Sequence, residues 1–269
     1  MKQASLISGG ALMSMLIVTA LVGSFWTPFD PTAIVGPRLQ SPVWPFVLGT
    51  DGQGADIFSR MLHGARLCLL VGLASVTGAA LVGVPVGVVA GMVRGWTGEV
   101  LGRGADILYG FPALLLAILF AAALGGSIWT AIAAVALATI PAFVRIARAA
   151  TLQVMGQGYV EAARLSATPS TRIAVRHVLP NIAPVLGVQA SVSVGLAILA
   201  EAGLSYLGLG SGSKDPTWGR MLREAQDFIF NAPLTALWPG LAITLATLGF
   251  TLLGDGLRDF LDPRLRELS

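Results

Sequence analysis

Few residues of this chain could do chemistry, because only 12% of its 269 residues are charged and two are histidine. The densest group lies in residues 145–177, where five arginines oppose one carboxylate, Glu161, for a formal charge of +4 with histidine neutral. Such a segment suits two roles. It could be a charged retention signal with affinity for anionic lipid, or a surface that contacts a partner protein, and composition alone leaves both open.

The other reactive residue types do not form a catalytic or metal site in the sequence. His63 and His177 are 114 positions apart, and Cys68, the single cysteine, has neither a disulfide partner nor metal-ligand spacing around it. Residues 208–214 superficially resemble a phosphate loop but lack the Gly-Lys-Ser/Thr ending. We therefore expect no catalytic residue, no metal site and no cofactor bound by this chain.

Three carboxylates, Asp106, Glu201 and Asp255, border or interrupt apolar stretches, where ionisable groups are functional candidates. Asp106 and Asp255 are expected near one membrane face. Glu201 is about 30 Å along a helix from Pro180 and is expected near the other face. A proton relay would need carboxylates near the membrane centre, so we predict structural ion pairs or helix caps, with gating as the functional alternative.

The elements that must carry these residues are membrane helices. Stretches without Asp, Glu, Lys, Arg or His occupy residues 4–29, 67–93, 107–144, 178–200 and 228–254. Each reaches the roughly 20 helical residues that span a bilayer core, and the longest divides at Gly125-Gly126-Ser127, a natural turn. The sequence predicts an all-α polytopic membrane protein with six transmembrane helices and excludes soluble enzymes, disordered tails and disulfide-rich secreted modules.

The basic residues predict the orientation. With a cytoplasmic N-terminus, eleven basic residues lie in cytoplasmic segments and six outside, as the positive-inside rule requires. Both termini are then cytoplasmic, and the longest outer segments are 30–65 and 208–233. The first apolar stretch exceeds a signal-peptide core, so we expect an uncleaved helix. Basic patches interleaved with aromatic residues are missing, so no nucleic-acid partner is expected.

The polar segment between the fourth and fifth predicted spans has a helical pattern of its own. Residues 158–166 favour a helix after the glycine. A second short helix is predicted from Pro169 to Leu179, with Thr168 as its N-cap. Pro180 would then open the next span.

Small residues recur every four positions in the second predicted span: Ala79, Gly83, Gly87 and Gly91. Such a face lets another helix approach closely. We favour packing within the chain over a contact between subunits.

Two segments of the cytoplasmic loop carry a family resemblance. Tyr-Val-Glu-Ala-Ala-Arg-Leu at 159–165 and Arg-His-Val-Leu-Pro-Asn at 176–181 are similar to the EAA loop of ABC-transporter importer permeases. In that family the loop is a coupling helix that sits in a groove on the ATPase subunit. The resemblance implies an ATPase contact through Tyr159, Glu161, Ala162, Ala163, Arg164, Ala167 and Arg176.

The chemistry of this loop fits such a contact. Ala162 and Ala163 would form a small-residue knob, and Glu161 would meet a basic group of the partner. The family usually has glycine where this chain has Ala167. Because glycine tolerates a positive φ, we expect the turn at Ala167 to be built differently.

Further motifs occur in the order found in the dipeptide/oligopeptide/nickel branch of these permeases, over about residues 28–264. They are Leu48-Gly49-Thr50-Asp51, Asp56-Ile57-Phe58-Ser59-Arg60, Asp106 with Phe111-Pro112, Glu201-Ala202, Leu204 to Gly210, Trp218-Gly219, Trp238-Pro239-Gly240, and Gly254 to Asp259 with Leu261-Asp262-Pro263. The short N-terminal arm and the ending resemble the C-type permease, the second of two membrane subunits. Ala55 stands where the branch normally has arginine, so a local salt bridge is expected to be missing.

The resemblance implies a type I ABC importer permease fold in three parts. These are an N-terminal helix and extracytoplasmic loop (1–66), a permease domain (67–257) that contains the coupling loop 145–180, and a cytoplasmic tail (258–269). The outer segments would form a docking region for a binding protein around Asp51, Asp56 and Trp218.

The implied assembly contains a homologous B-type permease in a heterodimer, two ABC ATPase subunits that hold ATP and magnesium, and an extracytoplasmic substrate-binding protein. The chain would be no enzyme. It would form half of a pathway across the inner membrane for peptides, nickel or other metal chelates, or similar small solutes. An ion-gradient-driven secondary transporter or channel is the alternative.

Overall fold

The computed structural model describes residues 2–93, 95–210 and 215–261, so residues 262–269 of the predicted tail, with Asp262 and Pro263, lie outside the described residues. The long helices are α1 (Lys2–Phe25), α2 (Ile57–Met92), α3 (Trp96–Tyr109), α4 (Ala113–Leu124), α5 (Ile128–Met155), α8 (Leu179–Tyr206) and α10 (Leu234–Leu261). The short ones are α6 (Gly158–Leu165), α7 (Ser170–Ile173), the π-helical η1 (Ala174–Val178), α9 (Trp218–Ala225) and the 3₁₀ turn η2 (Gln226–Phe228). The predicted all-α class is confirmed.

Five of the described helical segments are long and apolar enough to cross a membrane, and α3 with α4 forms a sixth candidate. The predicted third span, residues 107–124, is therefore wrong as a single helix: α3 and α4 meet at 88°. Phe111 precedes Pro112, and a residue before proline is disfavoured in the helical region. Pro112 itself takes the N-cap position of α4.

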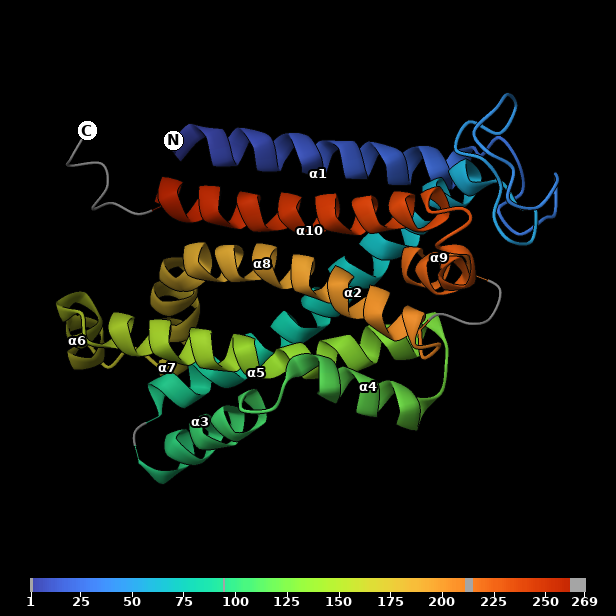
Figure 1. Ribbon diagram of the computed structural model, residues 1–269. Coiled ribbons are helices and arrows are strands. Elements are labelled where there is room, and N and C mark those ends of the chain that lie inside the picture. The colour runs from blue at the N-terminus through green and yellow to red at the C-terminus, as the bar shows by residue number, and fades with distance from the viewer. Residues whose placement is uncertain (1, 94, 211–214, 262–269) are drawn as a thin grey trace.

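The helices run between two ends of the molecule (Figure 1). One end, which we name the α6 end, holds α6, the start of α1 and the end of α10. The opposite end, the α9 end, holds α9, residues 26–56 and the turn between α4 and α5. The predicted cytoplasmic loop and both described chain ends thus share one side, and the predicted outer segments share the other.

The second span begins ten residues earlier than predicted. Asp56 is the N-cap of α2, and its carboxylate accepts a hydrogen bond from the Ser59 backbone N–H at 2.8 Å. The predicted boundary at residue 66 therefore falls inside α2. Arg60, His63 and Arg66 give this first part of the helix the polarity of a loop, which is why the uncharged stretch marked its start too late.

The predicted turn between the third and fourth spans is confirmed. Gly125 has a φ of 87°, which glycine adopts without steric cost. Ser127 is the N-cap of α5 and forms a capping box with Thr130, in which each side chain accepts from the other residue's backbone N–H.

The predicted cytoplasmic loop 145–180 is largely helix that continues from its neighbours. α5 extends to Met155, and a helical run from Ser170 passes through η1 into α8 as far as Tyr206. Pro180 stands at the start of α8 as predicted, but η1 leads directly into α8, so the helical run is continuous there. Thr168 is not an N-cap, since Pro169 occupies that position before α7.

The small-residue face of α2 packs against α5 within the chain. A Cβ on Gly87 would lie 2.5 Å from the Val144 carbonyl oxygen and 2.6 Å from the Ala147 Cβ. Gly83 meets Phe143 and Gly91 meets Thr151 at similar distances. The prediction of intramolecular packing is confirmed.

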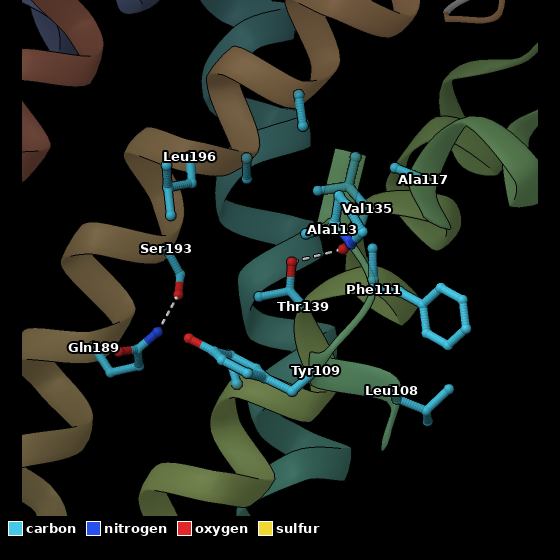
Figure 2. A pocket seen from close by; sticks show the side chains of 15 residues that line it. Leu108, Tyr109, Phe111, Ala113, Ala117, Val135, Thr139, Gln189, Ser193 and Leu196 are labelled. Carbon is cyan, nitrogen blue, oxygen red and sulfur yellow. Dashed lines mark hydrogen bonds between the residues drawn. The ribbon is translucent and has the colours of Figure 1, made fainter. Parts of the chain in front are cut away.

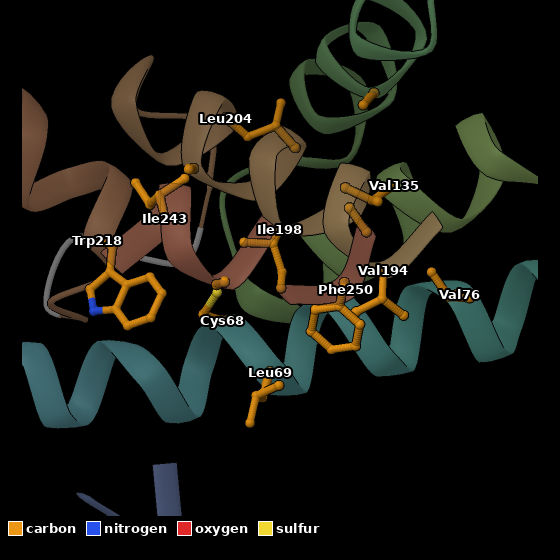
Figure 3. Close-up of a cluster of buried hydrophobic side chains, with 14 of the residues drawn as sticks. Cys68, Leu69, Val76, Val135, Val194, Ile198, Leu204, Trp218, Ile243 and Phe250 are labelled. Atoms are coloured by element: carbon orange, nitrogen blue, oxygen red, sulfur yellow. The ribbon is translucent and has the colours of Figure 1, made fainter. Parts of the chain in front are cut away.

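The main core lies where α2, α5, α8, α9 and α10 converge (Figure 3). Ile198 of α8 is fully buried among Cys68 of α2, Val135 of α5 and Phe250 of α10. Cys68 is 2% exposed, as expected for a packed apolar residue. This core holds the elements of the two ends in fixed relation.

Candidate functional site

α6 is held on the bundle by one fully buried side chain. Val160 is 0% exposed and packs in a small apolar cluster with Val88 of α2, Ile173, Val178 and Ile182. This cluster is separate from the main core. One side of α6 is therefore fixed to the ends of the spanning helices, and its other side is open.

The open side of α6 carries most of the residues predicted to contact an ATPase. Glu161, Ala162 and Arg164 are exposed, whereas Ala163 is half-buried against the Val160 cluster. Only Ala162 of the predicted small-residue pair thus lies on the exposed face. Leu165, which the sequence analysis did not single out, is 85% exposed. Its exposure could have been predicted from the sequence, because Leu165 lies one helical turn after Glu161 on the same short helix.

The turn after α6 is a Schellman motif closed by an alanine in the left-handed region. Ala167 has a φ of 55°. The Thr168 N–H donates to the Ala163 carbonyl at 3.1 Å, and the Ala167 N–H donates to the Arg164 carbonyl at 3.0 Å. The expectation that alanine would change this turn is wrong: Ala167 adopts the glycine-type conformation, at a cost of about 1 kcal/mol.

A ring contact joins α6 to η1. The Tyr159 and His177 ring centroids are 6.0 Å apart with an angle of 47° between the planes. Tyr159 remains 46% exposed, and Arg176 beside His177 is exposed. Together with Glu161, Arg164 and Leu165, these are exposed residues of α6 and η1, and we call the five (Tyr159, Glu161, Arg164, Leu165 and Arg176) the α6 surface.

Asp106 lies away from the α6 surface, on α3. It lines a cavity of about 240 Å³ with Arg145 and Arg148 of α5. Within the described residues Asp106 forms no ion pair, Arg145 lies over the Tyr109 ring at 4.8 Å, and the Arg148 Nε is buried without a hydrogen-bond partner. The predicted structural ion pair of Asp106 is therefore not formed in this conformation.

Asp255 is exposed inside α10, which continues to Leu261, so its predicted position after the last span and a role as a cap there are wrong. The neighbouring Gly254 and Gly256 are buried against α8 and α1. These glycines, more than the carboxylate, explain why this segment packs closely.

Glu201 is buried in α8, near the α9 end as predicted. It is 1% exposed, and its carboxylate accepts from the Ser205 hydroxyl at 2.6 Å. The side chain of Thr217, the N-cap of α9, also lies close enough to interact with this carboxylate. Glu201 therefore does not pair with a cation in the described structure. It joins the end of α8 to the start of α9.

The three residues predicted for binding-protein docking are buried. Asp51 accepts from the N–H groups of Gln53 at 2.8 Å and Ala55 at 2.9 Å, and Asp56 caps α2. Trp218 is 3% exposed and donates its indole N–H to the Met61 carbonyl at 3.1 Å. These side chains shape the outer segments from inside and are not themselves surface contacts.

An ionic junction at the α9 end was missed from the sequence. Arg60 of α2 pairs with Asp51 and, through its other terminal nitrogen, with Glu224 of α9 at 2.7 Å. Arg220 also binds Glu224, at 2.7 Å. Ala55 itself supplies no charge, and the salt bridge of the neighbouring Asp51 comes from Arg60.

The outer segment also holds a small local turn at its start. The Thr32 hydroxyl and N–H both donate to the Asp30 carboxylate, at 2.7 and 2.8 Å. These hydrogen bonds, that from the side chain first, stabilise the charged form and lower the pKa of Asp30. They order the chain where it leaves α1.

Comparison with known proteins decides the family. The sequence profile described as "Binding-protein-dependent transport system inner membrane component" matches residues 83–267. The chain belongs to this family. Family membership makes it a membrane-spanning permease subunit of an ABC importer, and the secondary-transporter alternative is not supported.

Full-length relatives place this permease in the peptide branch. It is 43% identical to a dipeptide transport system permease protein DppC of Alkalihalophilus pseudofirmus, over 96% of this chain and 86% of the relative. It is 38% identical to a glutathione transport system permease protein GsiD of Pectobacterium atrosepticum, over 99% of this chain and 89% of the relative. The predicted resemblance to a C-type permease is confirmed.

The fold of this permease also matches a solved importer. The inward-facing MetNI methionine ABC transporter superposes with a TM-score of 0.61, covering 78% of this chain and 96% of the other, at 19% identity. At that identity the likeness establishes the type I permease fold alone.

Proposed function

We propose that this permease forms half of a peptide pathway, paired with a homologous B-type permease in a heterodimer. Two ATPase subunits, which hold ATP and magnesium, would bind at the α6 end, and a substrate-binding protein would dock at the α9 end. Both termini would be cytoplasmic. The printed names of the relatives, dipeptide and glutathione permeases, favour peptides over the nickel or metal chelates also considered.

The observation that carries this proposal is the construction of α6. Val160 is fully buried at its base, while Glu161, Arg164 and Leu165 are exposed beside it. Because α6 is fixed to the bundle on one side and exposed on the other, a movement of an ATPase bound to its exposed side would be transmitted to the bundle. The Leu165 side chain would enter an apolar part of the ATPase groove, and Glu161 would meet a basic group there.

The helical run from Ser170 to Tyr206 supports transmission of this movement. Residues of η1 pack in the Val160 cluster at the α6 end, and Glu201 lies close to the cap of α9 near the other end. Closure of the ATPases would therefore shift α8 and α9 together. This is coupling between distant sites through rigid elements.

The α9 end offers the docking surface for the binding protein. Asp51, Asp56 and Trp218 hold that surface from inside, and Phe230 at 97% and Trp44 at 86% are exposed on it. Both segments that carry these aromatic residues were predicted to be outside.

The test changes the charge of the α6 surface in the complete importer, by one reversal and one introduced carboxylate. Glu161→Lys and Leu165→Asp are expected to abolish peptide uptake and ATPase association while membrane insertion stays intact. Glu99→Lys, an exposed reversal on α3, is the matched control and should retain both. Normal uptake by Glu161→Lys and Leu165→Asp would contradict the proposal.

A further inference from the structure

A cavity beside the broken span has a mostly apolar lining that contains a few polar side chains. The cavity has a volume of about 360 Å³ and is bounded by the α3–α4 break, α5 and α8 (Figure 2). None of the fifteen described residues that line it is charged. Its polar side chains are Tyr109, Thr139, Gln189 and Ser193.

The polar group lies near the middle of the spans. Thr139 is the twelfth of 28 residues in α5, and Ser193 is the fifteenth of 28 in α8. In secondary transporters, substrate sites commonly lie at this depth beside broken helices, and the same placement is available in this permease. A bend of 88° between α3 and α4 borders the cavity here.

The hydrogen bonds among the polar residues that line the cavity leave some of their donors and acceptors available to a substrate. The Gln189 Nε2 donates to the Ser193 Oγ at 2.9 Å, and the Thr139 hydroxyl donates to the Val135 carbonyl at 2.7 Å. By their chemistry, Gln189 keeps its carbonyl oxygen and a second N–H, and Ser193 keeps its own O–H. Figure 2 shows Gln189 and Ser193 together on the α8 side of the cavity.

We propose that Gln189 and Ser193 contact the substrate during passage and recognise its peptide backbone. In an extended residue the N–H and C=O point to the same side, so one carboxamide can accept from the first and donate to the second. Ser193 holds the Gln189 side chain in place for this pairing. Because the lining is uncharged, it does not select for charged side chains of the substrate. This property suits a route for short peptides of varied sequence.

The chemistry disfavours other cargo at this position. A metal ion or an inorganic anion leaving water needs charged ligands or a full shell of polar ones, whereas this lining has no charged residue and only four polar side chains. An uncharged amide group needs only one donor and one acceptor. The inference rests on the proposed function. It adds that this permease recognises the backbone amide groups of the peptide.

The test uses the complete importer in proteoliposomes with its binding protein and trialanine as the probe. Peptide transported per ATP hydrolysed is compared for the wild type, Gln189→Met and Gln189→Glu. Both variants keep the side-chain length, and both remove the N–H donor. We expect the ratio to fall about tenfold, the effect of losing hydrogen bonds worth about one decade in equilibrium.

The controls separate substrate contact from folding and from coupling. Leu199→Met changes an exposed apolar residue of α8 that does not line the cavity, and it should leave the ratio unchanged. ATP hydrolysis stimulated by the loaded binding protein should persist in every variant, which shows that the complex is assembled. A wild-type ratio in Gln189→Met and Gln189→Glu, or an equal fall in Leu199→Met, would overturn the inference. Failure of the wild type to transport trialanine would instead contradict the proposed peptide function.

Discussion

Arg60 and Glu224 are 164 positions apart in sequence, yet the guanidinium of one donates to the carboxylate of the other at 2.7 Å. Arg60 stands at the start of α2 and Glu224 on α9. With Asp51 on its other terminal nitrogen, Arg60 ties the outer loop, the second span and α9 into one unit. These ion pairs thus hold together the segments that form the surface proposed to bind the binding protein.

Removing the cation of this junction should destabilise the permease. The Arg60 side chain is 8% exposed and Asp51 11%, so Arg60→Ala leaves a buried carboxylate unpaired. We expect a loss of about 3 kcal/mol. Arg103→Ala breaks an exposed pair on α3 and should cost about 0.5 kcal/mol or less. Thermal unfolding of the purified complex in detergent measures both, and equal midpoints for the two variants would contradict the buried-junction account.

The glycine face of α2 gives a second prediction. Gly87→Ala places a Cβ 2.5 Å from the Val144 carbonyl oxygen and must separate α2 from α5, at a cost of about 1–3 kcal/mol. Gly78→Ala meets only the Ala136 Cβ at 3.6 Å, an ordinary contact, and should be neutral or stabilising because alanine favours helix. The comparison is made by thermal unfolding. If Gly78→Ala costs as much as Gly87→Ala, close packing is not the reason for the glycine at 87.

The sequence predicts the class and the number of spans because uncharged length is a physical requirement of the bilayer core. It also predicts the turn at Gly125 and Ser127, where local residues decide the conformation. It does not predict that α2 begins at Ile57 or that the helix from Ser170 continues into α8. Charged residues can occupy helices outside the apolar core, so an absence of charge marks the membrane and not the helix.

Side-chain placement at the site was harder to predict for a related reason. The family motif located α6, but Ala163 and Leu165 differ in exposure through contacts with distant helices. Arg60, Asp51 and Glu224 are separated in sequence, and only the tertiary fold brings them together. The polar group of Gln189 and Ser193 has no charge and no motif, so nothing in the sequence distinguishes it from ordinary span residues.

Glu201 gives a prediction about geometry versus charge. Its carboxylate accepts from Ser205 and lies close to the cap residue Thr217. Glu201→Gln keeps a polar group of the same shape and should preserve uptake and thermal stability. Glu201→Leu leaves the buried Ser205 hydroxyl without this partner and should cost about 1–3 kcal/mol. Uptake by the complete importer and its unfolding midpoint are the measurements. Loss of uptake in Glu201→Gln, with stability retained, would show that the charge itself is needed.

A substitution at Ala167 tests whether backbone strain lowers the stability of the turn after α6, independently of the side-chain contacts of the α6 surface. Its φ of 55° is costly for alanine and free for glycine, so Ala167→Gly should raise stability, by up to about 1 kcal/mol, even though no contact is added. The matched control is Ala162→Gly, five residues earlier and inside α6, where glycine should lower stability by about 1 kcal/mol. Thermal unfolding of the complex measures both variants. Because glycine adopts the same φ and the substitution preserves the turn, ATPase association should be unchanged in Ala167→Gly. A lower unfolding midpoint in Ala167→Gly would mean that the alanine conformation is not strained, and the Schellman turn would then owe its stability to the neighbouring contacts of Ala163 and Thr168.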